Sequence, residues 1–318
     1  MSHRSGEWLW SKNLLSLSLY PLSLLFCGLT KLRKLAYELG LFHAVKISCP
    51  VVVVGNLSVG GNGKTPVVIS LISLLKQKGY RPGIVLRGYK SQAEGTISVL
   101  QKGEQNSLVG DEANMLSTIC ECPIAVGLDR PKAAQALSDQ DLVDIIISDD
   151  GLQHYALARD VEVVVQRQMA MGNGWCLPAG PLREPVSRLK TVDLVVERDQ
   201  ADVIESLSTT WSLSNQDETK ELSEFVGQKV HAIAGIGFPS VFFDALRAIG
   251  LEVIEHHFQD HYDFVIEDLE FADNLPILMT HKDAVKLQHY QLENSWVVSL
   301  KLELSDTIQT KFLKLIQH

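Results

Sequence analysis

A run of four valines followed by a glycine-rich turn, VVVVGNLSVGGNGKTP at Val51–Pro66, limits what this chain can fold into more than any other stretch. Consecutive β-branched residues predict a strand that is buried on both faces, as in a parallel sheet. The apolar run ends at Gly55, and apolar residues at helical spacing predict a helix over Pro66–Lys78. Because Lys64-Thr65 stands between the glycines and the helix, these features follow one another as in a phosphate-binding loop.

Such a loop would bind the phosphates of a nucleotide. Glycines let successive backbone N–H groups point at phosphate oxygens, and the helix N-terminus adds partial positive charge. Lys64 would contact the β- and γ-phosphates, and the Thr65 hydroxyl would hold Mg²⁺. The strict pattern G-x-x-x-x-G-K-[ST] has glycine where this chain has Ser58, and an ordinary glycine-rich turn is the structural alternative. The candidate phosphate-binding residues are Ser58, Val59, Gly60, Gly61, Asn62, Gly63, Lys64 and Thr65.

Composition indicates a globular protein and argues against several classes. Hydrophobic residues make up 46% of the chain and the charges are dispersed, as in globular proteins. A length of 318 residues is enough for two domains. The net charge of −9 argues against general nucleic-acid binding. The five cysteines show no C-x-x-C spacing, so we expect reduced thiols and neither a disulfide framework nor a zinc site.

The N-terminal segment combines an apolar run with positive charge. Leu14–Leu29 is almost uncharged, but it is shorter than the ~20 residues that a membrane-spanning helix needs. Two tryptophans precede it, Lys31, Arg33 and Lys34 follow it, and residues 1–46 carry a net charge of +4. We therefore predict a helix that lies in the interface of an anionic membrane. A signal peptide and a core helix are the alternatives.

Beyond the turn, short apolar runs alternate with helical patterns, which predicts a parallel α/β sheet. A polar, acidic stretch at residues 199–224 indicates a boundary, and more strands and helices follow it. The predicted fold is a P-loop NTPase-like parallel sheet domain with a smaller α/β domain and an N-terminal hydrophobic helix. The predicted segments are a membrane-associated helical region at 1–46, a P-loop core at 47–205, a linker at 206–226 and a C-terminal domain at 227–318.

Acidic and polar side chains stand where two predicted elements end or begin. Asp149-Asp150 follows a buried apolar strand, and Gln153 and His154 come directly after it. A carboxylate beside a phosphate loop is the expected Mg²⁺-side group of a P-loop enzyme. Asp111-Glu112 opens a predicted helix after Gly110 and could form a second carboxylate site. Capping of helices and turns is the structural alternative for both pairs.

Two further segments carry candidate chemistry. The stretch Asn173–Arg188 is rich in glycine and proline, and its position indicates a functional loop near the carboxyl edge of the sheet. Its Arg183 and Arg188 could receive an anionic phosphate group. In the C-terminal half, Asp260 could orient the ring of His261. The histidine spacings there are not those of a zinc site.

Taken together, these residues resemble the tetraacyldisaccharide 4′-kinase family, the lipid A 4′-kinases of Gram-negative bacteria. As a set the matching stretches are highly specific, and they span most of the chain in the family's order. Ser58 belongs to the family's own variant of the phosphate loop, whereas His281 stands where an acidic residue is expected. The matching stretches are Gly55–Pro66, Arg87-Gly88-Tyr89, Gly110-Asp111-Glu112, Asp149–His154, Leu177–Pro185, Asp260-His261 and Lys282–Lys286.

The resemblance implies that ATP, with Mg²⁺, phosphorylates the 4′-hydroxyl of a tetraacylated glucosamine disaccharide 1-phosphate. It implies a peripheral or monotopic protein at the cytoplasmic face of the inner membrane. The expected partners are the acylated disaccharide lipid and an anionic membrane surface, with no nucleic acid and no evident protein partner. By motif, the family's Asp–His pair falls on Asp111 and His261. The further expected roles are catalysis for Lys64 and Asp150, metal binding for Thr65, Asp149, Glu112 and Gln153, and substrate binding for Arg87, His154, Arg183 and Arg188.

Two other functions remain open from the residues alone. A P-loop kinase or ligase of a soluble metabolite would not need Leu14–Leu29, and its activity would not depend on detergent. A P-loop GTPase switch would need the guanine-reading pattern Asn-Lys-x-Asp. The chain contains His281-Lys282-Asp283, which lacks the spacer residue of that pattern.

Overall fold

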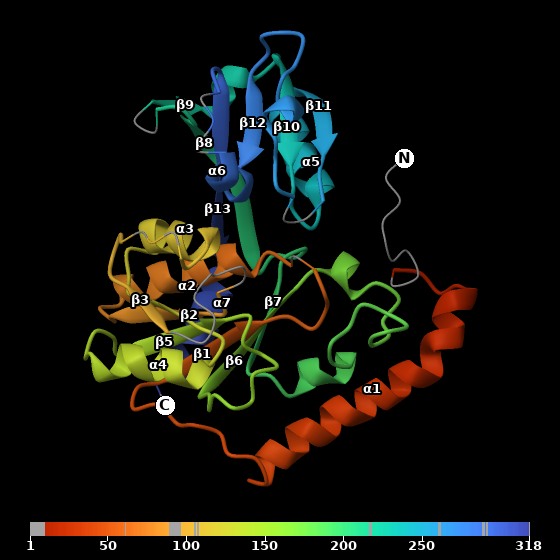
Figure 1. Ribbon diagram of the computed structural model, residues 1–318, viewed down its shortest axis with the longest axis vertical. Helices are drawn as coiled ribbons and strands as arrows, with labels where there is room; N and C mark the ends of the chain where they lie inside the picture. Colours follow the sequence, from red (N-terminus) through yellow and green to blue (C-terminus); the bar gives the residue numbers. More distant parts are fainter. Residues whose placement is uncertain are drawn as a thin grey trace. The chain divides into compact units, whose positions relative to one another are not determined.

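The computed structural model describes residues 10–60, 62–88, 97–104, 106, 108–215, 218–259, 262–287, 290 and 292–317. The chain forms two compact units. One comprises Met1–Ile204 and Glu303–His318, and the other comprises Glu205–Leu302. Each unit is built on its own sheet (Figure 1), so the prediction of two α/β bodies with an apolar N-terminal helix is confirmed.

The first unit contains a seven-stranded sheet with the order β3-β4-β2-β5-β1-β6-β7. All neighbouring strands are parallel except the short edge strand β3, which runs antiparallel to β4. The strands are β1 (Val51–Gly55), β2 (Pro82–Leu86), β3 (Ser98–Leu100), β4 (Ile124–Val126), β5 (Ile145–Asp149), β6 (Val161–Gln166) and β7 (Leu194–Glu197).

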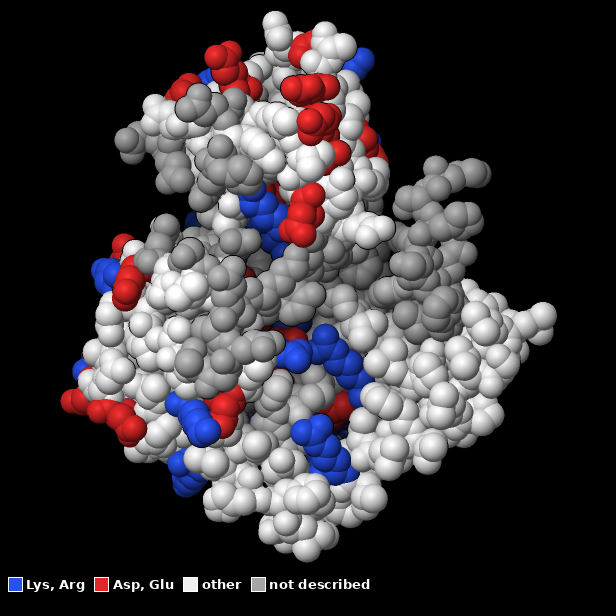
Figure 2. Space-filling view, viewed as in Figure 1, with Lys and Arg blue, Asp and Glu red and all other residues white. Residues whose placement is uncertain are grey.

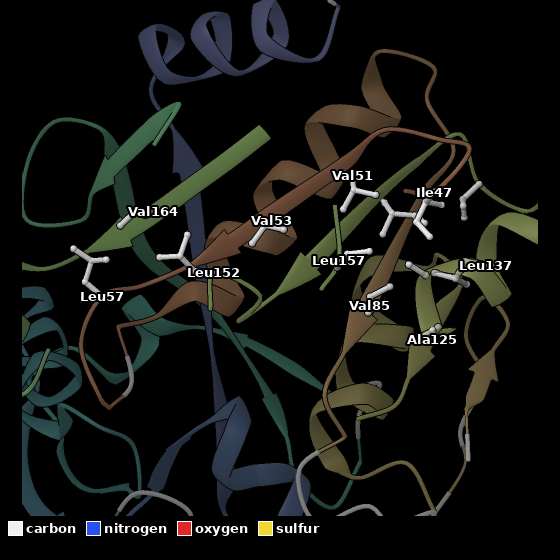
Figure 3. Packing of buried hydrophobic residues seen from close by; sticks show 14 of the residues in the cluster. Ile47, Val51, Val53, Leu57, Val85, Ala125, Leu137, Leu152, Leu157 and Val164 are labelled. Carbon is white, nitrogen blue, oxygen red and sulfur yellow. The ribbon is translucent and has the colours of Figure 1, made fainter. Parts of the chain in front are cut away.

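Burial explains why β1 lacks the polar alternation of a surface strand. All five of its residues are buried, because β5 and β6 flank it and other side chains cover both faces. Val51 and Val53 belong to a cluster that also contains Val85 and Leu152 (Figure 3). The four valines therefore encode the central strand of this sheet.

The carboxyl ends of the central strands meet at one edge. In the parallel register Val54 pairs with Asp149 of β5, and Gly55 pairs with Val164 of β6. The chain places β2 beyond β5 on one side of β1 and β6 on the other. Such a reversal of strand order is where parallel α/β sheets bind ligands.

Four helices pack in this unit around the sheet. α2 (Lys64–Gln77) contacts β1, β2 and β5 as well as α3 (Asp111–Cys120), and α7 (Asp306–Ile316) contacts β7. α4 (Arg130–Asp139) contacts β2 and β4, and the side chain of Asp129 caps its N-terminus. The described residues of this unit also form short 3₁₀ helices at Gln168–Met171 (η2) and Val186–Lys190 (η3).

The helix α1 (Leu14–Glu38) is longer than the predicted apolar run and continues through Pro21. Asn13 and Ser16 form a capping box at its start. It contains an 18-residue stretch with a mean hydropathy of 1.4, of which 11% is buried, so by length and composition it could cross a membrane. Its leucines are largely exposed, and Figure 2 shows a surface almost without charged side chains where Figure 1 places this helix.

One face of α1 packs on the loop that follows β6. The Ser23 hydroxyl donates to the carbonyl of Cys176 at 2.6 Å, and the ring centroids of Tyr20 and Trp175 lie 4.5 Å apart. A disulfide joins Cys27 to Cys176. The expectation of reduced thiols is therefore wrong for this pair, because folding brings together cysteines that are 149 residues apart. Cys49, Cys120 and Cys122 are free.

The second unit holds a six-stranded sheet of order β11-β10-β12-β13-β8-β9. Parallel pairing joins β11, β10, β12 and β13, and β9 is antiparallel to β8. Its elements are β8 (Val203–Ser212), β9 (Thr219–Glu221), η4 (Leu222–Phe225), β10 (Lys229–Ala234), α5 (Pro239–Ile249), β11 (Glu252–His257), η5 (Ile266–Asp268), β12 (Ile277–Thr280), α6 (His281–Leu287) and β13 (Ser295–Leu304).

The observed boundaries differ from the predicted segments in two places. Residues 206–226, predicted as a linker from their polarity, contain most of β8 and all of β9. β9 is the edge strand of the second sheet and β8 lies next to it; an edge strand tolerates polar residues because one of its edges faces solvent. The terminal helix α7, predicted as part of the C-terminal domain, belongs to the first unit.

Candidate active site

The phosphate loop connects β1 to α2 at the carboxyl edge of the first sheet. Gly63 is the N-cap of α2 and adopts a left-handed conformation, with φ 65° and ψ 43°. Within the described part of the chain no side-chain hydrogen bond caps this helix, and its first turn contains no acidic residue. A helix N-terminus without these partners is suited to bind an anion through its backbone N–H groups.

Polar side chains inside the loop fix its shape. The Asn62 amide donates to the Ser58 hydroxyl at 2.8 Å, and the Asn56 amide donates to the Ser58 carbonyl at 2.9 Å. All three side chains are buried, and Asn62 Oδ1 has no hydrogen-bond partner among the described residues. Ser58, which departs from the strict glycine pattern, thus serves as a hydrogen-bonding centre for the loop.

A second loop runs beside the phosphate loop. Ser58 and Leu182 form an isolated antiparallel bridge, and the Val59 N–H donates to the Pro181 carbonyl at 2.8 Å. The Arg183 N–H donates to the Leu57 carbonyl at 2.6 Å. This pairing brings a stretch more than 120 residues away in sequence to the edge where β1 ends.

Lys64, Asp150 and Arg183 converge at this edge. The Lys64 ammonium lies 3.2 Å from Asp150 Oδ1 and 3.3 Å from Asn56 Oδ1, and Arg183 lies 3.2 Å from the same Asp150 oxygen. Burial of Asp150 favours its neutral form, but the two cations outweigh that effect and lower the pKa of Asp150 to about 2. Asp150 is therefore ionised at neutral pH and holds both cations together.

Thr65, Glu112 and Asp149 form an oxygen-rich group beside them. The Thr65 hydroxyl donates to Glu112 Oε1 at 3.2 Å. Burial raises the pKa of Asp149, and the negative charges of Glu112 and Asp150 raise it further. A cation bound here would relieve this repulsion, and the donor set of hydroxyl and carboxylate oxygens suits Mg²⁺.

Mg²⁺ fits these residues only if other ligands complete its coordination. Among the described residues, no three His, Cys, Asp or Glu side chains form a ready metal cage. That result agrees with the usual chemistry of Mg²⁺, which one or two carboxylates hold together with substrate phosphates. Thr65, Asp149 and Glu112 are the side chains of this group that would hold it.

Arg130 was not predicted as a site residue, yet it fixes the Asp149–Asp150 turn. Its guanidinium is buried and donates to the Ser148 hydroxyl at 2.8 Å and to the backbone carbonyls of Asp149 and Asp150. Burial lowers the pKa of Arg130 to about 10. Asp150 has a φ of 50°, which is unfavourable for a non-glycine residue. The bonds from Arg130 help to hold this conformation.

Glu184 joins several predicted residues in a buried network. It accepts hydrogen bonds from Gln153 at 2.8 Å, Tyr155 at 2.9 Å and Arg188 at 3.1 Å. Arg188 also contacts Glu162, and its side chain is 4% exposed. The structure thus places Arg188 between two carboxylates, and the amide of Gln153 also donates to the carbonyl of Asn56. Glu184 was not assigned a role from the sequence.

The remaining predicted residues lie as follows. Arg87 is exposed directly after β2, and His154 is partly buried after β5. Burial, followed by the charges of Arg130 and Arg87, lowers the pKa of His154 to about 4. Asp111 is the first residue of α3. The side chain of Asp111 and all of Gly61 and His261 lie outside the described parts of the structure.

Comparison with known proteins identifies relatives over nearly the whole chain. A sequence model described as "Tetraacyldisaccharide-1-P 4'-kinase" matches residues 15–317. The tetraacyldisaccharide 4'-kinase of Nitrosococcus oceani is 45% identical over 306 residues, covering 94% of this chain and 90% of that protein. The Coxiella burnetii protein of the same name is 41% identical over 311 residues, covering 98% and 94%.

A solved structure is also similar. It is the crystal structure of the "apo" form of LpxK from Aquifex aeolicus in complex with ATP. The TM-score is 0.79 at 27% sequence identity, and the match covers 95% of this chain and all of that one. The family indicated by the sequence motifs and the family found by these comparisons are the same.

Proposed function

This chain belongs to the tetraacyldisaccharide-1-P 4'-kinase family and is a kinase, and we propose that it transfers the γ-phosphate of ATP to a lipid A precursor. The acceptor is the 4′-hydroxyl of a tetraacylated glucosamine disaccharide 1-phosphate. The observation that carries the proposal is the convergence of Lys64, Asp150 and Arg183 at the open N-terminus of α2. Two cations and a row of backbone N–H groups at one point suit a polyphosphate.

Each of these groups has a distinct task in phosphoryl transfer. The backbone of Ser58–Lys64 and the Lys64 ammonium bind and orient the phosphate chain. Arg183 is partly exposed, with 29% of its side chain accessible, and can stabilise the charge that develops on the transferred group. Asp150 orients both cations before the nucleotide binds. Preorganised charges of this kind lower the barrier because they need no rearrangement during the reaction.

Mg²⁺ belongs to the proposal through Thr65, Asp149 and Glu112. When bound, it would supply positive charge that offsets the negative charge of the phosphates. Arg130 donates a hydrogen bond to the backbone carbonyl of the buried Asp149, and this bond helps to fix the position of Asp149. Gln153 donates its amide to Glu184, and its proposed contribution to the metal site would come from its amide oxygen.

Proton removal from the acceptor hydroxyl is assigned by motif to Asp111 and His261. A sugar hydroxyl is a poor nucleophile, and a positioned proton acceptor typically contributes ~10²–10⁴-fold to the rate. Arg87 and His154 flank the same carboxyl edge and are proposed to contact the substrate. His154 is neutral at pH 7 because its pKa is lowered to about 4, so it would act as a hydrogen-bonding group and not as a cation.

The proposed location is the cytoplasmic face of the inner membrane. A water-soluble nucleotide must meet an acylated acceptor, so the catalytic unit has to work at a bilayer surface. α1 presents exposed leucines over most of its length and basic residues near its end. This arrangement supports a peripheral or monotopic attachment to an anionic membrane.

The test is transfer of labelled phosphate from ATP to the tetraacyl disaccharide 1-phosphate in detergent micelles. Lys64→Ala should lower turnover by about a hundred-fold or more, because it removes a charge at the transferred phosphate. The matched control is Lys76→Ala in the same helix, whose ammonium binds the backbone carbonyls of Cys120 and Glu121. Wild-type turnover by a folded Lys64→Ala protein would overturn the assignment of the phosphate loop.

A further inference from the structure

Arg198 reaches the phosphate loop from the edge of the sheet. It follows β7 directly, and its backbone N–H donates to the Gln166 carbonyl at 2.9 Å, in register with β6. Its side chain is buried, and Nη1 donates to the carbonyls of Asn62 at 3.3 Å and Gly63 at 3.0 Å. One guanidinium therefore holds two consecutive carbonyls of the turn before α2.

The orientation of those two peptides follows from their carbonyls. In a trans peptide the N–H points opposite to the C=O of the same unit. Because Arg198 holds the carbonyls of Asn62 and Gly63, the N–H groups of Gly63 and Lys64 point away from the guanidinium. Those two N–H groups belong to the part of the loop that would meet phosphate oxygens.

The absence of a side chain at position 63 is what admits Arg198. A Cβ atom built on Gly63 would lie 1.3 Å from Arg198 Nη1 and 2.5 Å from its Cζ. Gly63 also has a positive φ of 65°, which other residues adopt only at a cost. By contrast, a Cβ atom at Gly60 would meet no atom of the described residues within 4 Å. Gly63 and Arg198 thus form a matched pair.

We propose that Arg198 is a positioning residue for ATP, which holds the Asn62–Gly63 carbonyls so that the following N–H groups are oriented for phosphate before the nucleotide binds. The proposal rests on the proposed nucleotide site at Lys64. Arg198 does not touch the transferred group in this scheme. It favours ATP binding equally in the ground state and the transition state, so its loss should appear in KM and not in kcat.

The first measurement is the KM for ATP in the detergent kinase assay, together with kcat and the melting temperature. Arg198→Met should raise KM by about ten-fold, because hydrogen bonds from a charged donor are lost, while kcat stays within about three-fold. Arg198→Lys should recover part of the loss. Arg81→Met is the control: it removes a largely exposed cation just before β2, at the strand end away from the carboxyl edge, and should leave KM unchanged. An unchanged KM in Arg198→Met would overturn the proposal.

The second measurement tests the close contact between Gly63 and Arg198 by changing position 63, so that the proposal does not rest on the Arg198→Met variant alone. Gly63→Ala should raise KM for ATP at least as much as Arg198→Met, since the new methyl group displaces the guanidinium. The KM for ATP of the double variant Gly63→Ala/Arg198→Met should be no higher than that of Gly63→Ala, because the guanidinium that clashes with the new methyl group is absent. A double variant whose KM change equals the product of the single changes would refute the pairing. Lys64→Ala, run in parallel, reports on the nucleotide site itself, so a failure of that site is distinguishable from a failure of Arg198.

Discussion

Replacing Arg188 by methionine should destabilise the first unit and leave the chemistry largely intact. From the sequence, Arg188 is a candidate for binding the substrate's anionic phosphate. In the structure its guanidinium lies between Glu184 and Glu162, with the Arg side chain 4% exposed and the two carboxylate side chains 5% and 13% exposed. Removing the arginine leaves the two carboxylates without this cation, in a position where water solvates them poorly.

The expected magnitude follows from what each carboxylate retains. Breaking a buried ion pair typically costs about 3–5 kcal/mol. Glu162 keeps Arg159 at 3.3 Å, and Glu184 keeps hydrogen bonds from Gln153 and Tyr155, so we expect about 3 kcal/mol. For a unit of this size each kcal/mol lowers the melting temperature by about 2–4 °C, which gives a fall of roughly 6–12 °C.

The assay is thermal unfolding followed by circular dichroism, with kcat and the KM for the acceptor measured on the same preparations. Arg183→Met is the matched control. Its guanidinium is 29% exposed and pairs with Asp150, whose side chain is 36% exposed, and such pairs contribute about 0–1 kcal/mol. Arg183→Met should therefore melt close to the wild type and lose turnover, which is the opposite pattern to Arg188→Met.

The reasoning about Arg188 is refuted by one specific result. An Arg188→Met protein that melts within about 2 °C of the wild type, while its KM for the acceptor rises ten-fold, would mean that Arg188 meets the substrate. A double variant with Glu162→Gln should lose less than the sum of the single losses, because the two residues are in contact.

Three further predictions address the membrane, the base and pH. Deleting residues 1–29 should move the protein from the membrane fraction to the soluble fraction or cause aggregation, because α1 carries the exposed leucines; a folded deletion variant that still binds membranes at high salt would contradict this. Asp111→Ala and His261→Ala should each lower kcat strongly with little change in ATP affinity, and their effects should combine to less than their product; unchanged kcat per folded molecule would remove that residue from the mechanism. The pKa of His154 is lowered to about 4 in the folded state from 6.5, so the unfolded chain binds more protons between these values and stability should fall as pH drops from about 6.5 to about 4. Melting curves over this range should show a shallower fall for His154→Gln, and identical slopes would argue against a lowered pKa of His154.

Local pattern determined most of the fold because the central strands are buried on both faces. The four valines of β1 and the Gly-Lys-Thr turn placed the sheet, the phosphate loop and α2 without any tertiary information. Asp149 and Asp150 could be selected as candidate site residues because carboxylates are rarely buried unless they are paired. β8 and β9 were missed because Val203–Ser212 and Thr219–Glu221 lack the continuous apolar run that predicted β1 and β5.

Only the tertiary structure decided which residues from distant parts of the sequence meet at the carboxyl edge of the first sheet, and which partners they contact there. Cys27 and Cys176 looked unpaired because their spacing carries no signal, and packing of α1 on the loop joins them. Arg183 and Arg188 lie five residues apart in the stretch Asn173–Arg188, yet Arg183 pairs with Asp150 and Arg188 is buried between two carboxylates. Arg130 and Arg198 carry no motif, since each acts through backbone carbonyls of another segment. Sequence periodicity reports which face of an element is buried, whereas the partner of a buried charge depends on how the loops meet in three dimensions.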